Sequence, residues 1–169
     1  GNYSTSVFTT PMDIRNNIFN NVRTGGTGKH YAIANTIGGT ASATGWGTNA
    51  SNYNILNGNA ATIGFWSGDR TFAAWRTSSS SDANSYTASV PTFVNSLVGD
   101  LHLNMGLTAN NFEAHGIDIP GFNTDFDNQT RPGPTAVNGG GFAPDMGADE
   151  FDGVPLSNLP PTITYTART

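Results

Sequence analysis

The apolar residues of this chain fall into short clusters of about three to five residues, bounded by residues that favour turns. Residues 31–34, 72–75 and 101–103 are examples, and Gly, Asn, Ser, Thr or Pro flanks each of them. No window sustains the i, i+3, i+4, i+7 apolar spacing of an amphipathic helix. The pattern predicts short strands separated by turns, and therefore an all-β chain rich in loops.

The composition excludes several classes of protein. Charged residues make up only 11% of the chain, against about 25% in an average soluble domain. Seven cations against twelve anions provide no basic face for nucleic acid. The longest apolar runs are far shorter than the 18 or so residues of a membrane span. We therefore expect no nucleic-acid partner and no membrane span.

Ten Phe, five Tyr and three Trp argue against a disordered chain, although its polar and glycine-rich composition is common in disordered segments. The chain has no Cys, which excludes a disulfide framework but not secretion. Its first residues have neither the basic nor the apolar region of a signal peptide. We expect a folded chain that is a mature product or a fragment.

One internal echo favours stacked strands. Asn17-Ile18-Phe19-Asn20 recurs as Asn54-Ile55-Leu56-Asn57, so two apolar residues stand between asparagines in both copies. Equivalent residues of stacked strands lie about 4.8 Å apart, which lets asparagine side chains form a hydrogen-bonded ladder. With a loop insertion at residues 38–51, the echo predicts successive turns of a parallel β-helix.

A change in composition near residue 153 suggests two parts. We expect β-helix coils and a terminal cap over residues 1–153, followed by a proline-rich linker and an extended strand over residues 154–169. The alternating residues Thr162, Ile163, Thr164 and Tyr165 could add a strand to a neighbouring copy. Such head-to-tail contacts do not close, and they predict filaments.

Four motifs lie in order in the second half of the chain. They are Pro-x-Phe-Val-Asn at residues 91–95, Asp-x-His-Leu at 100–103, Asp-x-Asp-x-x-x-Arg-Pro at 125–132 and Asp-x-Gly-Ala-x-Glu-Phe at 145–151. This series resembles the C-terminal end of secreted bacterial right-handed parallel β-helix proteins of the pectate-lyase-like, surface-anchored kind. The resemblance implies the terminal coils of such a β-helix, with long loops and an extended tail, in a secreted protein at the cell surface.

The same motifs suggest structural roles for their acidic residues. An Asp at a chain corner can accept hydrogen bonds from backbone N–H groups, and Arg131 can neutralise the carboxylates of the Asp-x-Asp turn. Gly147 would let the backbone pass close to a neighbouring strand. Phe151, with Phe126 and Phe142, is predicted to close the end of the coil stack.

We expect no cofactor, and calcium is the metal that the sequence favours if one is bound. Asp125 and Asp127 offer oxygen ligands at alternating positions, which suits a hard cation. Zinc is disfavoured, because His30, His102 and His115 are isolated in the sequence and no Cys accompanies them.

Aromatic residues provide candidates for carbohydrate contact. Trp46, Trp66 and Trp75, with Arg76 beside the last, could stack on sugar rings, while the alternative interpretation places these rings in the core. Candidate carboxylates for glycoside hydrolysis are available, but sequence spacing cannot pair them across coils. No catalytic residue is therefore assigned.

Two functions remain open from the sequence. The leading hypothesis is a non-enzymatic structural or adhesive module of a secreted bacterial surface protein, self-associating end to end into filaments, whose partner is a second copy or an extracellular polysaccharide. The alternative is a carbohydrate-binding or polysaccharide-degrading domain, of the lyase or hydrolase kind.

Overall fold

The computed structural model describes most of the chain between residues 12 and 153. The described residues are 12–37, 39–41, 44, 46–58, 61–87, 90–104, 112–132, 141–151 and 153. The expected tail and linker at 154–169 lie outside them, together with Thr162, Ile163, Thr164 and Tyr165.

The first part of the chain places short strands side by side in parallel. The six strands are β1 (Ile14–Arg15), β2 (Ile18–Asn21), β3 (Ile33–Asn35), β4 (Ser51–Asn52), β5 (Ile55–Gly58) and β6 (Gly64–Trp66). β1 pairs with β4, β2 with β5 and β3 with β6, so one pass of the chain lies on the next. We call residues 12–87 the coil body.

The asparagine echo is confirmed at the level of this pairing. Ile18 lies opposite Ile55, and Phe19 lies opposite Leu56, which is the register that the repeated residues predict. Asn57 Nδ2 donates to Asn20 Oδ1 at 2.6 Å, and Asn17 Nδ2 lies 3.2 Å from Asn54 Oδ1. The amide side chains thus bond from one strand to the next, as in a ladder.

The predicted fold class, an all-β right-handed parallel β-helix, is wrong. The described residues form four separate sheets of only two or three strands. β6 pairs in antiparallel orientation with β7 (Asp69–Arg70), and β8 (Phe93–Asn95) does so with β9 (Asp100–Leu103). The parallel pairing of the coil body does not extend into a solenoid sheet, and an α-helix, α1 (Phe72–Ser79), interrupts the strands.

The apolar cluster at residues 72–75 forms the helix α1, where the sequence predicts a strand. Thr71 caps its first turn, because Thr71 Oγ1 accepts a hydrogen bond from the backbone N–H of Ala74 at 3.3 Å. Ala73 and Ala74 favour helix. The helix is eight residues long, and no helix among the described residues is long and apolar enough to cross a membrane.

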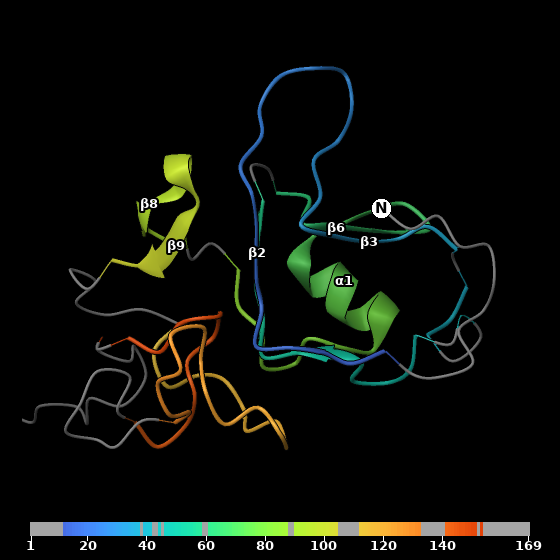
Figure 1. Ribbon diagram of the computed structural model, residues 1–169. Helices are drawn as coiled ribbons and strands as arrows, with labels where there is room; N and C mark the ends of the chain where they lie inside the picture. The colour runs from blue at the N-terminus through green and yellow to red at the C-terminus, as the bar shows by residue number, and fades with distance from the viewer. Residues whose placement is uncertain are drawn as a thin grey trace, which may run out of the picture.

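Two apolar cores lie on opposite sides of the β2–β5 ribbon. In Figure 1, α1 lies on one side of β2 and the C-terminal loops lie on the other. Phe19 and Leu56 belong to the first core, which contains Trp46, Trp66 and Trp75. Ile18 and Ile55 belong to the second core, with Leu103 of β9 and three residues of the C-terminal loops: Phe112, Met146 and Phe151. Because side chains alternate along a strand, one short ribbon serves both cores.

The three tryptophans form a compact group in the first core. Each ring meets the other two nearly edge to face, with centroids 5.4 to 5.8 Å apart. Their indole N–H groups donate to Ser81 Oγ, the Gly39 carbonyl and Asp82 Oδ2. A Cβ on Gly64 would lie 2.7 Å from the ring of Trp75, so glycine is required at that position.

The C-terminal loops of residues 112–132 and 141–151 contain turns and bends, with one isolated bridge between Thr124 and Thr130. Gly147 approaches the coil body closely, as predicted: its N–H donates to the Asn16 carbonyl at 2.9 Å, and a Cβ there would meet Ile18 Cδ1 at 2.9 Å. Phe151 is fully buried, whereas Phe126 and Phe142 are exposed, so the predicted three-residue plug is wrong for those two.

The fold predicts that replacing two asparagines of the repeated segment lowers the free energy of unfolding by very different amounts. Asn54 is fully buried and bonds to Asn17, Ile14, Ser51 and Asp82, whereas Asn20 is exposed. Asn54→Ala strands several buried polar groups, so we expect a loss of about 2–4 kcal/mol in the free energy of unfolding. Asn20→Ala should cost less than about 1 kcal/mol. Urea unfolding measures both, and equal losses would contradict the assignment.

Candidate functional site

Two motifs that are separate in the sequence meet in the C-terminal loops. Arg131 Nε forms an ion pair with Glu150 Oε1 at 2.6 Å, and the same guanidinium donates to the carbonyls of Asp145 and Gly147. Asp125 Oδ2 accepts the backbone N–H of Glu150 at 3.0 Å. The Asp-x-Asp turn and the Asp-x-Gly-Ala-x-Glu-Phe segment are thereby joined by side-chain contacts in place of a sheet.

Asp125 acts as the turn cap that the sequence predicts. Its Oδ1 accepts the backbone N–H groups of Asp127 at 2.9 Å and Gln129 at 2.7 Å, while Oδ2 is bonded to Glu150. Both oxygens are therefore engaged, and Asp127 turns away toward His102. Asp125 and Asp127 therefore have different partners, and calcium binding by these two residues stays a prediction. Arg131 binds Glu150 and not these two carboxylates.

Several acidic side chains are buried beneath the C-terminal loops, and few cationic side chains lie near them. Asp145 is fully buried, and its two oxygens accept the backbone N–H groups of Ala114 at 2.6 Å and Phe151 at 2.8 Å. Burial nevertheless raises the pKa of Asp145 to about 8, since it outweighs the two amide bonds. Burial also raises the pKa of Glu150, against the effect of Arg131. Glu150 Oε2 is buried without a hydrogen-bond partner.

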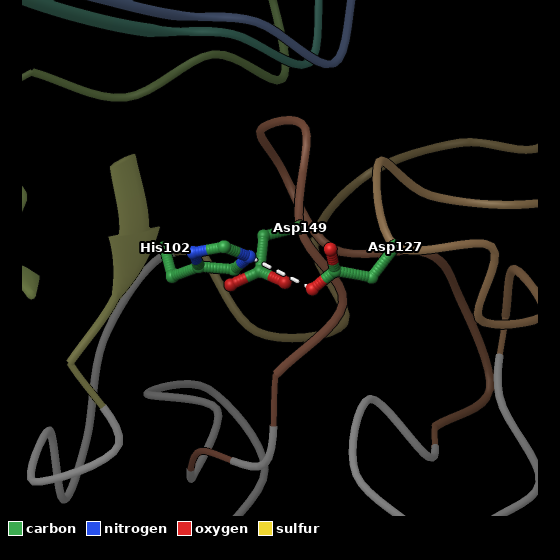
Figure 2. A group of neighbouring side chains, drawn as sticks. All are labelled: His102, Asp127 and Asp149. Carbon is green, nitrogen blue, oxygen red and sulfur yellow. Dashed lines mark hydrogen bonds and ion pairs between the residues drawn. The ribbon is translucent and has the colours of Figure 1, made fainter. Parts of the chain in front are cut away.

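His102 lies at the exposed side of the same loops (Figure 2). Its Nδ1 is 2.6 Å from Asp100 Oδ1, and its Nε2 is 2.8 Å from Asp127 Oδ2. Hydrogen bonds to these two carboxylates, first Asp100 and then Asp127, raise the pKa of His102 to about 9. Asp149 lies beside the ring, and ligand atoms of His102, Asp127 and Asp149 all lie within 4.8 Å of one another. We call these three residues the His–Asp–Asp group.

This group was not predicted from the sequence, because each histidine is isolated there. Asp100 and His102 share one face of β9, since residues two apart in a strand point the same way. That spacing was the only available signal. Asp127 and Asp149 come from separate loops, and no spacing in the sequence places them next to β9.

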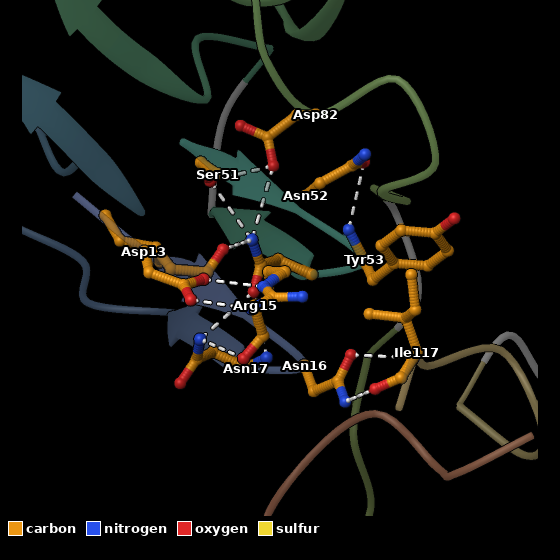
Figure 3. A network of polar contacts seen from close by, with 11 residues as sticks. Asp13, Arg15, Asn16, Asn17, Ser51, Asn52, Tyr53, Asp82 and Ile117 are labelled. Carbon is orange, nitrogen blue, oxygen red and sulfur yellow. Dashed lines mark hydrogen bonds and ion pairs between the residues drawn. The ribbon is translucent and has the colours of Figure 1, made fainter. Parts of the chain in front are cut away.

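A cleft of about 660 Å³ lies between the coil body and the C-terminal loops. Figure 3 shows its coil-body side, where Asp13 pairs with Arg15 and the Asn16 side chain bonds both to the carbonyl and to the N–H of Ile117. Apolar residues line much of the cleft; they include Ile18, Phe93, Leu101, Leu103, Ile117, Ile119 and Phe122. Asp149 also lines it, so the cleft reaches the His–Asp–Asp group.

The predicted carbohydrate platforms lie in the core. Trp46, Trp66 and Trp75 are 5%, 2% and 0% exposed, and a ring buried to this degree offers no face to a sugar. Arg76 is on the exposed face of α1, where its guanidinium lies 5.8 Å from the centre of the Phe72 ring and donates to the Ala83 carbonyl. The four residues therefore do not form one surface, and the core interpretation of the tryptophans applies.

The comparisons with known proteins give no relative. No family model matches the chain, and neither a curated protein nor a solved structure matches it. The function is therefore inferred from the residues of the chain itself.

The contacts of His102 predict an unusual titration. Two-dimensional NMR should show that its ring loses a proton with a pKa of about 9. Asp100→Asn should lower this pKa more than Asp127→Asn does, because the Asp100 hydrogen bond makes the larger contribution. Asp69→Asn, in the coil body beside Lys29 and Tyr31, should leave it unchanged. An equal response to all three substitutions would contradict the geometry.

Burial of Asp145 predicts that stability falls as the pH rises. Its pKa is raised from 3.8 to about 8 in the folded chain, so between these values the folded state holds a proton that the unfolded state has lost. One such proton lowers the free energy of unfolding by about 1.4 kcal/mol per pH unit. Asp145→Asn should flatten the dependence between about pH 4.5 and 6, measured by urea unfolding, although it lowers stability overall.

The matched control for this measurement is Asp13→Asn. Asp13 is exposed, and its hydrogen bond with Arg15 lowers its pKa, so its protonation lies below the measured range. The Asp13 variant should therefore keep the pH dependence of the unsubstituted chain. A slope that disappears in both variants, or in neither, would rule out Asp145 as its source.

Proposed function

We propose that this chain is a non-enzymatic structural or adhesive module of a secreted bacterial surface protein. The observation that carries the proposal is the set of hydrogen bonds and the ion pair that the carboxylates of the motifs form. Asp125, Asp145 and Asp149 each accept backbone N–H groups from other parts of the loops, and Glu150 both accepts an N–H and pairs with Arg131. The chemistry of these residues holds loops together.

The motif residues that resemble secreted surface proteins are the same residues that meet in space. Leu103 of the Asp-x-His-Leu motif donates its N–H to Asp149. Arg131 of the Asp-x-Asp-x-x-x-Arg-Pro motif binds Glu150. A shared structural role explains why the four motifs occur together in order. These contacts support the structural part of the proposal, although the described residues do not form the β-helix that the resemblance implies.

Self-association is part of the proposal, and the β8–β9 hairpin supports it. The hairpin stands beside the rest of the molecule (Figure 1) and exposes apolar side chains: Val94 56%, Leu97 96%, Val98 77% and Leu101 58%. A two-stranded sheet with open edges and an apolar surface favours pairing with another chain. The occupant that we propose is a second copy of this chain.

Sedimentation and electron microscopy of the purified chain at high concentration test this part. We expect assemblies that Leu97→Asp disrupts, because it places a charge at the most exposed apolar position. Val22→Asp is the matched control, since Val22 is 54% exposed but lies in the coil body. A chain shortened to residues 1–153 tests the proposed contribution of Thr162, Ile163, Thr164 and Tyr165. Strictly monomeric particles of the full chain would contradict self-association.

An assay on acidic polysaccharides and a glycan array test whether the module is non-enzymatic and adhesive. The non-enzymatic proposal predicts no release of unsaturated or reducing ends from any substrate. Turnover that survives purification of the chain to homogeneity would favour the lyase or hydrolase alternative. Glycan binding without turnover would retain the adhesive role and identify the polysaccharide as its partner.

A further inference from the structure

We propose that His102, Asp127 and Asp149 bind one divalent transition-metal ion of the zinc type. The proposal concerns a site that the function above does not require. It rests on the convergence of one imidazole and two carboxylates from three separate segments, and on the orientation of the imidazole.

The positions of the three side chains suit a small cation. Their ligand atoms lie within 4.8 Å of one another, and Figure 2 shows all three directed at one point between β9 and the two loops. Zinc lies about 2.0–2.2 Å from nitrogen and oxygen ligands, which places tetrahedral ligand atoms roughly 3.3 Å apart. Small movements of the side chains are enough to bring the three atoms to that separation.

Asp100 orients the imidazole from behind. His102 Nδ1 lies 2.6 Å from Asp100 Oδ1, and this contact leaves Nε2 directed toward Asp127. A carboxylate bonded to the far nitrogen is the usual partner of a metal-binding histidine, because it fixes the ring and raises its basicity. Asp100 is therefore a positioning residue and not a ligand.

Asp149 is the most deeply buried of the three residues. It is 9% exposed, and its Oδ2 accepts the backbone N–H of Leu103 at 3.1 Å, so the carboxylate is held against β9. A cation bound between Asp149, Asp127 and His102 would offset the negative charge of the two carboxylates.

The donor set selects the class of ion. Calcium and magnesium prefer ligands that are all oxygen, whereas an imidazole nitrogen favours zinc and similar metals. Three protein ligands leave a fourth position for water. His102 and Asp127 are partly exposed, and Asp149 borders the 660 Å³ cleft, so that position is accessible to solvent.

Calorimetric titration of the full 169-residue chain with Zn²⁺ and with Ca²⁺ is the first test. We expect one Zn²⁺ per chain and no comparable binding of Ca²⁺. His102→Ala and Asp149→Asn should each abolish binding, while Asp100→Asn should weaken it about 10- to 100-fold. His30→Ala is the matched control, because His30 is a histidine in the coil body whose ring bonds to the Gly25 carbonyl. It should bind as the unsubstituted chain does.

A second measurement needs no variant and is therefore independent of any effect on folding. Nitrogen-15 NMR of the unsubstituted chain should show Zn²⁺ shifting the Nε2 resonance of His102 while Nδ1 keeps its proton. Co²⁺ added to the unsubstituted chain should give the visible absorption of a four- or five-coordinate site. The absence of Zn²⁺ binding, preferential Ca²⁺ binding, or a shift at His30 or His115 in place of His102 would overturn the site. None of these results bears on the proposed structural role.

Discussion

The pairing of β2 with β5 is the constraint on which the rest of the molecule depends. Ile18 and Ile55 face the C-terminal loops, and Phe19 and Leu56 face the tryptophans, because neighbouring side chains in a strand point to opposite faces. A shift of one residue in either strand would send an apolar side chain to the wrong core. The asparagines at both ends of the ribbon oppose such a shift, since their amide bonds form only in the observed register.

This local feature could be predicted from the sequence, whereas the fold class could not. The repeated Asn-Ile-x-Asn pattern contains both the apolar pair and the bonding partners, so its register follows from the residues themselves. The number of stacked turns cannot be predicted from this pattern. Residues 72–75 look like another strand, and Thr71 with two alanines makes them a helix instead. The motifs at residues 125–151 resemble strand corners, but carboxylate-to-backbone bonds hold them together without a sheet.

The candidate site could be predicted only in part for a related reason. Asp125 was identifiable as a turn cap because its partners lie two and four residues away. The partners of His102 lie in segments 25 or more residues distant, apart from Asp100. Similarly, the tryptophans were recognisable as important, but their burial depends on contacts among three separate segments, since Trp75 lies in α1, Trp66 in β6 and Trp46 in a loop. Contacts between loops that share no periodic pattern carry no signal in a single sequence.

The position of the three tryptophans has a practical consequence for the study of this protein. All three belong to the core on the α1 side of the ribbon, and the core beneath the C-terminal loops is built from phenylalanine, aliphatic residues and two tyrosines. Indole fluorescence therefore reports on one side of the molecule alone. The loops could detach while the emission spectrum stays native, and a second probe near Phe112 or Phe151 is needed to observe whether the two halves unfold as one unit.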